Sequence, residues 1–413
     1  MCVHLNTVTM TRIVVLLLLP LFASALQGAE FEAALASTPH EVVAFDVQPP
    51  PFAATGTTMN SGRYPKRMTA AVTTHGRSLR VELEKHATII SQRFEHITMD
   101  EAGAIVSREP LGPEGHCVYR GRVYAARDTE QSEQLGDALL SVCDGNVHGE
   151  MRLGETDRLV VAPHPTQRGS HVVFQHADYE APGYAGRTCA SGDRMGDHRP
   201  SFLHRAGEGH HDHHDASAEM EEHENGEAHD QPPRHDAHVA SSRRRLAFGA
   251  VNKEVEMLIV NDYARSNQFT GAGTPTGNMV SRNAAIVAIA EEHYHNGYNS
   301  GALEYKIDIT IVDMVSWASG NPMTVAAGDI YSTYWSFTDW ISAQQASGAL
   351  PRYDNTQLFS GVNFGGPAGV GGLGTMCWGE YSAGIIMAPE SWPNGHVAFV
   401  LAHELGHNLG EFG

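Results

Sequence analysis

The chain has 413 residues, of which 41% are hydrophobic, so it is long enough for two domains and apolar enough to form their cores. Its 48 acidic and 28 basic residues give a formal net charge of −20. This charge argues against nucleic acid as a partner, because a surface that binds phosphates must be positive.

The first segment, residues 1–25, has the pattern of a secretory signal peptide. Arg12 precedes an apolar run from Ile13 to Phe22, and the small residues Ala23-Ser24-Ala25 follow as a cleavage site. The run is too short to span a bilayer comfortably, and no other stretch approaches twenty apolar residues. We therefore expect a secreted protein without a membrane span apart from this segment. An uncleaved anchor is the alternative, and surface attachment through a further segment stays open.

The second segment, residues 26–203, alternates short apolar runs with turns. Residues 79–83 alternate with period two, and residues 158–162 form a strand-length run before Pro163. Because Gly, Pro, Asn and Asp bound such runs, the pattern predicts a mainly β unit.

The third segment, residues 204–245, is rich in histidine and ends in three arginines. Nine histidines lie among acids, Gly and Pro between His204 and His238. So little apolar surface predicts a disordered linker, with metal buffering as the alternative. Arg243-Arg244-Arg245 is typical of a convertase cleavage site after Arg245, because such proteases bind adjacent guanidinium groups. A merely charged end of the linker is the alternative.

The last segment, residues 246–413, has α/β periodicity. Strands are predicted at 255–260 and 305–312, and helices at 283–295 and 330–346. Residues 354–361 and 382–386 are interpreted as two further strands from the family resemblance described below. The aromatic residues of the second helix, Tyr334, Trp335, Phe337 and Trp340, are interpreted as core. A glycine-rich stretch, Gly369 to Gly374, lies between two of the strands, and its glycines are expected to weaken any strand there.

The strongest chemical pattern is His403-Glu404-Leu405-Gly406-His407. On a helix His403 and His407 are one turn apart, so both imidazoles project from one face and can hold one Zn²⁺ ion. Glu404 beside them can take a proton from water at the metal. Leu405 and Leu409 continue an apolar helical face, and Gly410 stands where the helix must end. An ordinary amphipathic helix with two chance histidines is the alternative.

The stretch HELGHNLG resembles the active-site helix of the metzincins, in particular the reprolysin or ADAM branch, whose full signature is HExxHxxGxxH followed by a methionine turn. The likeness covers roughly Lys253 to Gly410 well and the segment before the linker loosely. It implies a twisted, mostly parallel sheet with an active-site helix, preceded by a mainly β propeptide. It also implies a zinc metalloendopeptidase that acts on protein or peptide substrates, with Glu404 as general base.

The third ligand position of that signature is occupied by Gly413, which has no metal-binding side chain. A catalytic zinc usually has three protein ligands, so we expect weak zinc binding and little activity from the chain as written. We interpret the sequence as a truncated form, with a catalytically dead relative as the alternative. Two rival functions follow: a secreted binding or inhibitory pseudoprotease, and a metal-sequestering protein that uses the histidine-rich linker.

The cysteines are interpreted through the same resemblance. Loss of the signal peptide leaves Cys117, Cys143, Cys189 and Cys377, an even number that suggests pairing in an oxidising compartment. Cys117 and Cys143 resemble the paired half-cystines of a reprolysin-type propeptide. Cys189 resembles a cysteine switch that occupies the open zinc position until the propeptide leaves, with a free or differently paired cysteine as the alternative. Cys377 resembles the family cysteine whose partner lies beyond the zinc helix.

Overall fold

The computed structural model describes residues 31–48, 64–112, 115–126, 133–143, 146–154, 157–167, 169–179, 252–269 and 276–411. The predicted signal peptide and the histidine-rich linker lie outside these residues, as do Cys189, Arg245 and Gly413. No helix within the described ranges combines the length and apolar character needed to cross a membrane.

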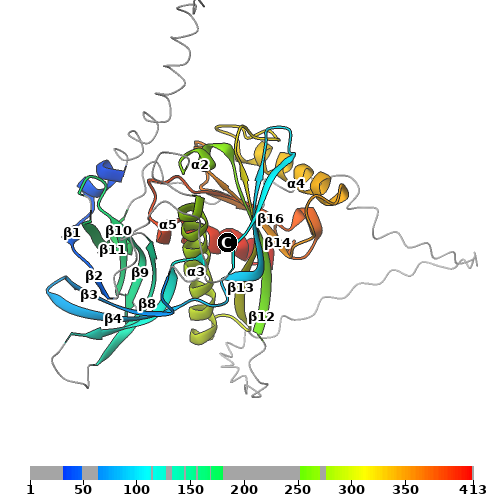
Figure 1. Ribbon diagram of the computed structural model, residues 1–413. Helices are drawn as coiled ribbons and strands as arrows, with labels where there is room; N and C mark the ends of the chain where they lie inside the picture. The colour runs from blue at the N-terminus through cyan, green and yellow to red at the C-terminus, as the bar shows by residue number, and fades with distance from the viewer. Residues whose placement is uncertain are drawn as a thin grey trace, which may run out of the picture. The chain divides into compact units, whose positions relative to one another are not determined.

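A nine-stranded antiparallel sheet, called here the N-terminal sheet, occupies most of the described chain before the linker (Figure 1). Its strands alternate because every second side chain faces the core; in β3 exposed and buried residues alternate throughout. The order is β1-β11-β10-β9-β8-β7-β4-β3-β2. The strands are β1 (His40–Val43), β2 (Asp46–Gln48), β3 (Arg67–Thr74), β4 (Arg77–Lys85), β7 (Val118–Ala125), β8 (Gln134–Cys143), β9 (Asn146–Leu153), β10 (Asp157–Pro163) and β11 (His171–Gln175).

A second sheet of seven strands, called here the C-terminal sheet, has the order β15-β16-β14-β12-β13-β5-β6. The four inner pairings, from β16 to β5, are parallel, and only the edge pairs β15–β16 and β5–β6 are antiparallel. The expected mostly parallel sheet is therefore present. Its strands are β5 (Ile90–Met99), β6 (Ile105–Pro110), β12 (Asn252–Asn261), β13 (Lys306–Trp317), β14 (Asn355–Ser360), β15 (Gly369–Gly371) and β16 (Ala383–Met387).

Two strands of the C-terminal sheet come from the segment before the linker. β5 pairs with β13 and β6 pairs with β5, so residues more than two hundred positions apart share one sheet. The predicted β character of the segment before the linker is confirmed, but its strands are divided between two sheets. The periodicity of single strands could not have shown this, because pairing partners leave no local pattern.

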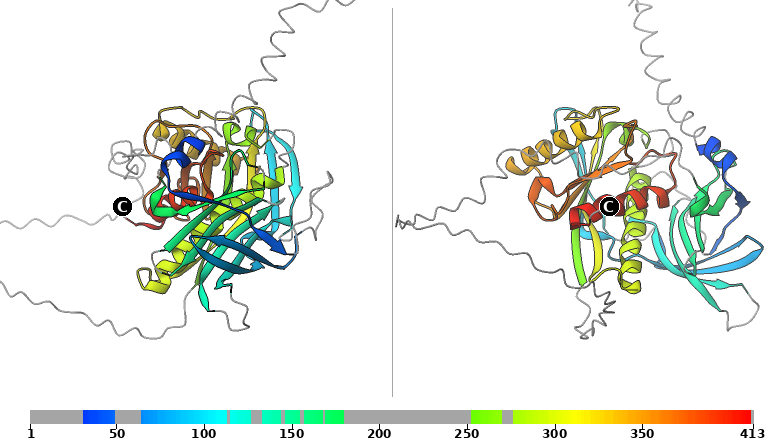
Figure 2. Two further views of the ribbon diagram at one scale, coloured as in Figure 1. Left: turned by 90° about the vertical axis from the view of Figure 1, so that its left-hand side faces the viewer. Right: turned by 180° about the vertical axis from the view of Figure 1, so that it is seen from behind.

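The helices of the C-terminal part are α2 (Tyr263–Asn267), α3 (Thr276–Ser300), α4 (Ile330–Ala346) and α5 (Asn394–Leu409). α3 packs against α5 and β13, and it also contacts β7, β8 and β9 of the N-terminal sheet. Figure 2 shows α3 with the N-terminal sheet on one side and the C-terminal sheet on the other. α3 and β13 are longer than predicted, whereas α4 has the predicted bounds. Tyr334, Phe337 and Trp340 of α4 are buried as expected, and Trp335 is half-buried.

Candidate metal centre

The helix α5 carries the predicted motif from His403 to His407. Val397, Leu401 and Leu405 on this helix are fully buried and hold it against the core. The helix ends at Gly410, which has a left-handed backbone with φ of 100°, and its N–H donates to the carbonyls of Gly406 and His407. The predicted helix and the predicted end are both confirmed.

The two imidazoles lie side by side on one face of α5. Their ring centroids are 4.7 Å apart and the rings are nearly perpendicular. His407 Nδ1 donates to the carbonyl oxygen of Glu411 at 2.9 Å, so the lone pair of this neutral imidazole is on Nε2. Within the described ranges His403 Nε2 is buried and has no hydrogen-bond partner. Burial, followed by the neighbouring His407, lowers the pKa of His403, and a neutral imidazole is the form that binds metal.

Glu404 lies against the edge strand β15. Glu404 is 1% exposed. A Cβ added to Gly369 would lie 2.6 Å from Cγ and 2.7 Å from Oε1 of Glu404. A Cβ added to Gly371 would collide with the backbone of Glu404. The glycines that were expected to weaken this strand are therefore required sterically. Only a strand without side chains at these positions lets α5 approach so closely.

Asn408 fastens the end of α5 to three segments of the sheet. Its Nδ2 lies within hydrogen-bond distance of the carbonyls of Gly372 (2.9 Å) and Ala383 (3.0 Å). Its Oδ1 accepts from Asn355 Nδ2 at 2.8 Å and from Gln357 Nε2 at 3.2 Å. These residues belong to the edge segment after β15, to β16 and to β14. This role was not predicted from the sequence, although an asparagine on the buried side of an apolar helix indicates a satisfied polar network.

Two further side chains from α3 position the start and middle of α5. Arg282 donates to the carbonyls of Glu390 and Trp392, both at 2.7 Å, and its Nε donates to Asn394 Oδ1 at 3.0 Å. Tyr294 donates its hydroxyl to the carbonyl of Ala402 at 2.6 Å. Neither contact set was predicted from the sequence, because the partners lie about a hundred residues away.

A catalytic zinc site usually has three protein donors, and α5 offers two imidazoles for that purpose. His403 and His407 fit the first two positions, and the hydrogen bond on His407 Nδ1 is the support that ligating histidines usually have. Position 413 is glycine and cannot supply the third donor. Within the described chain the group of three candidate donors that lie close enough to share an ion is elsewhere, at Glu291, His295 and Asp308.

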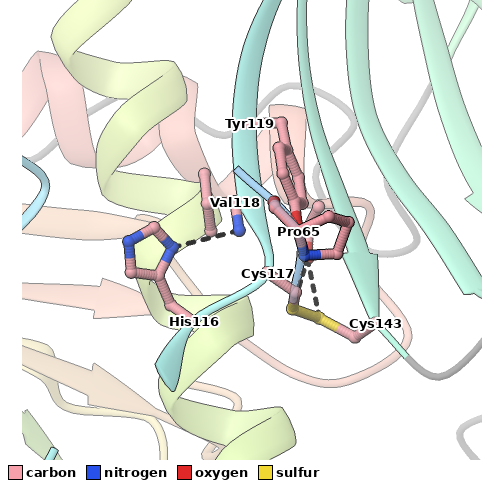
Figure 3. The surroundings of a disulfide bond; sticks show 7 residues. Pro65, His116, Cys117, Val118, Tyr119 and Cys143 are labelled. Carbon is pink, nitrogen blue, oxygen red and sulfur yellow. Dashed lines mark hydrogen bonds between the residues drawn. A yellow bond between two sulfur atoms is a disulfide. The ribbon is translucent and has the colours of Figure 1, made fainter. Parts of the chain in front are cut away.

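The predicted disulfide between Cys117 and Cys143 is present (Figure 3). It lies in the N-terminal sheet. It joins the residue before β7 to the last residue of β8. Nearby, Tyr119 donates its hydroxyl to the carbonyl of Pro65 at 3.0 Å. Cys377 is a free, exposed cysteine, and its thiol donates to Asp354 Oδ1 at 3.7 Å. Cys189 and Arg245 lie outside the described residues.

Comparison with known proteins identifies the C-terminal part. Residues 253–411 match the model of the reprolysin (M12B) family of zinc metalloproteases. The chain is 25% identical over 354 residues to human disintegrin and metalloproteinase domain-containing protein 19, and 26% identical over 351 residues to the mouse protein of that name. These alignments cover 84% of the chain but only 31% and 32% of the relatives, so the chain spans about a third of their length. A solved chaperone–substrate complex matches with a TM-score of only 0.28 at 14% identity, over 38% of this chain and 26% of that one.

Proposed function

Because residues 253–411 form a reprolysin-type metalloprotease domain, we propose that the chain is the precursor of a secreted zinc metalloendopeptidase. In this proposal His403 and His407 hold the zinc ion and Glu404 is the general base. The observation that carries it is the arrangement on α5: two adjacent imidazoles lie on one face of the helix, and Glu404, next to His403 in the sequence, faces the edge strand.

In the proposed hydrolysis of a peptide bond, each part of the site has a separate role. A bound zinc ion polarises the scissile carbonyl and lowers the pKa of water. Glu404 accepts the proton of the attacking water and then passes it to the amine nitrogen that leaves. The edge strand β15 offers main-chain groups with which an extended peptide can pair, and its glycines place that peptide close to Glu404.

We also propose that the chain as written has weak zinc binding and little hydrolytic activity. Gly413 supplies no third ligand, and the loss of one ligand in three removes both binding energy and the geometry that orients the reacting groups. Gly413 is likewise the observation that favours the rival function, a secreted binding or inhibitory protein without catalysis.

Latency and processing complete the proposal. The segment before the linker would act as a propeptide, a convertase would cut after Arg245, and Cys189 would act as a cysteine switch. The alternative for Cys189, a free or differently paired thiol, remains. The match to relatives along 84% of the chain, including this segment, supports the precursor organisation.

A comparison of three proteins tests the proposed function. All three are extended at the carboxyl end by a methionine turn: one keeps Gly413, one carries Gly413→His, and one combines Gly413→His with Glu404→Gln. Their zinc affinity is measured by chelator competition. We expect tight zinc binding in both histidine variants. After the linker is cut, we expect peptide hydrolysis only from Gly413→His with Glu404 intact.

Two results would contradict parts of this proposal. Equal zinc affinity with and without the histidine at position 413 would mean that another residue completes the site. Tight zinc binding without hydrolysis in Gly413→His would favour the non-catalytic function.

A further inference from the structure

A cavity of about 240 Å³ lies between the N-terminal sheet and the helix α3. Strands β7 to β10 line one side, and α3 and the start of β13 line the other; Figure 2 shows α3 beside the N-terminal sheet. One water molecule needs roughly 10–15 Å³ in such a space, so the cavity has room for a small ion. Its cationic side chains are Arg120, Arg152, Arg158 and Lys306. Its acidic side chains are Asp137, Glu150 and Glu292.

Two of the arginines stand directly opposite each other on neighbouring strands. In the antiparallel pairing of β9 with β10, Arg152 is the register partner of Arg158. Both side chains line the cavity, so they lie on the same face of the sheet. The Cβ atoms of such a pair are about 5 Å apart, and like charges at these positions destabilise a sheet. Negative charge beside the two guanidinium groups would remove this repulsion.

The acidic side chains near this pair supply little of that charge. Asp137 of β8 is the register partner of Arg152, yet within the described ranges the Arg152 side chain has no hydrogen bond or ion pair. Glu150 Oε2 lies 3.8 Å from Arg158 Nε. Burial raises the pKa of Glu150 to about 7, so this carboxyl is only partly ionised at neutral pH. Arg158 Nη1 donates to His293 Nδ1 at 3.4 Å, a contact that brings no negative charge.

The other two cations of the cavity are already paired within the protein. Arg120 Nη2 donates to Glu291 Oε2 at 2.9 Å and lies 3.3 Å from Glu292 Oε2. Lys306 Nζ lies 2.6 Å from Asp308 Oδ1. Arg120 Nε is nevertheless buried and has no hydrogen-bond partner in the part of the chain that the structure describes. The unbalanced positive charge is therefore that of Arg152 and Arg158, and Arg120 adds an unused donor.

The network around Glu291 argues against a metal ion beside the cavity. Glu291, His295 and Asp308 are close enough to share such an ion. Glu291 already accepts from His86 Nε2 at 3.0 Å and from the guanidinium described above. Asp308 already binds an ammonium group. Cationic side chains thus lie where a metal ion would have to bind, and the charge left over favours an anion.

We infer that the cavity is a binding site for a small tetrahedral oxyanion, phosphate or sulfate, held between Arg152 and Arg158. A planar guanidinium group donates to two oxygens of such an anion at once, and hydrogen bonds between charged partners are stronger than those between neutral ones. Arg120 lines the same cavity, and its unused Nε–H is a further donor for the ion. The inference does not depend on zinc binding or on hydrolytic activity.

Equilibrium dialysis of the full chain against radiolabelled inorganic phosphate, at constant ionic strength, tests the site. We expect saturable binding of one phosphate per chain that sulfate displaces and chloride does not. Absence of saturable binding, or equal displacement by chloride, would overturn the inference. Failure of sulfate to compete would overturn the assignment to tetrahedral oxyanions as a class.

A matched pair of variants locates the binding. Arg152→Gln should raise the dissociation constant of phosphate at least tenfold, because it removes the guanidinium that has no partner in the protein. Arg67→Gln removes an exposed arginine from a surface ion pair with Glu84, and it should leave the constant unchanged. If both variants weaken binding equally, the effect comes from net charge and the cavity is not the site.

Urea unfolding separates binding of the anion from a purely structural role of Arg152. Without phosphate, Arg152→Gln should be at least as stable as the unchanged chain, because it removes a like-charge pair. Saturating phosphate should raise the urea midpoint of the unchanged chain but not that of the variant, because a ligand stabilises only the state that binds it. A variant that is destabilised without phosphate and still responds to phosphate would show that Arg152 is structural, and would refute the site.

Discussion

The replacement Asn408→Ala should cost the domain about 3–4 kcal/mol of unfolding free energy. The amide makes contacts with Gly372 and Ala383 through Nδ2, and with Asn355 and Gln357 through Oδ1. Nδ2 has two hydrogens, so with the two bonds to Oδ1 at most four good bonds are lost. Each contributes about 1 kcal/mol, and the partners keep other bonds, which limits the further penalty.

Urea unfolding of the full chain measures this prediction, with the exposed Asn299→Ala as control. The control should change the free energy of unfolding by less than about 0.5 kcal/mol. Asn408→Asp should also destabilise, because it loses both donors and places a charge in the same buried site. A loss below about 1 kcal/mol for Asn408→Ala would refute the argument that this amide fastens α5 to the sheet.

Three further predictions concern pH, the edge strand and the disulfide. Burial lowers the pKa of His176 to about 4 and that of His293 to about 3. Neither group therefore changes the free energy of unfolding above about pH 6.5, and each lowers it as pH falls further, because the unfolded chain binds the proton first. Urea unfolding at pH 7.5 and 5.0 should show a loss of up to about 1.4 kcal/mol per pH unit for each histidine, and the double change to glutamine should remove that part of the dependence. Gly369→Ala should lower stability by about 1–3 kcal/mol because its Cβ collides with Glu404, and a raised urea midpoint would contradict the close packing. Cys143→Ser opens a bridge of sequence separation 26 and should cost about 3 kcal/mol; treatment of the unchanged protein with reductant should match it, and no loss in either would show that the bond does not stabilise the fold.

Local patterns in the sequence were sufficient for the elements that carry the site. The helix from Asn394 to Leu409, its end at Gly410 and the common face of His403 and His407 follow from side-chain spacing and from the freedom of glycine. Each is a property of a few neighbouring residues, so a single sequence is enough to predict it. The roles of these residues at a zinc ion remain predictions, as do the signal peptide, the cleavage site and the cysteine switch.

Only the tertiary structure showed what surrounds that helix. The pairing of β5 with β13, the network around Glu291 and the anchoring of Asn408 all join residues that are far apart in the chain. A strand's own alternation records which face is buried but not which strand lies beside it. The glycine at position 369 looks like a weakness in sequence, and the need for it appears only when the side chain of Glu404 is seen in the space that a Cβ would fill.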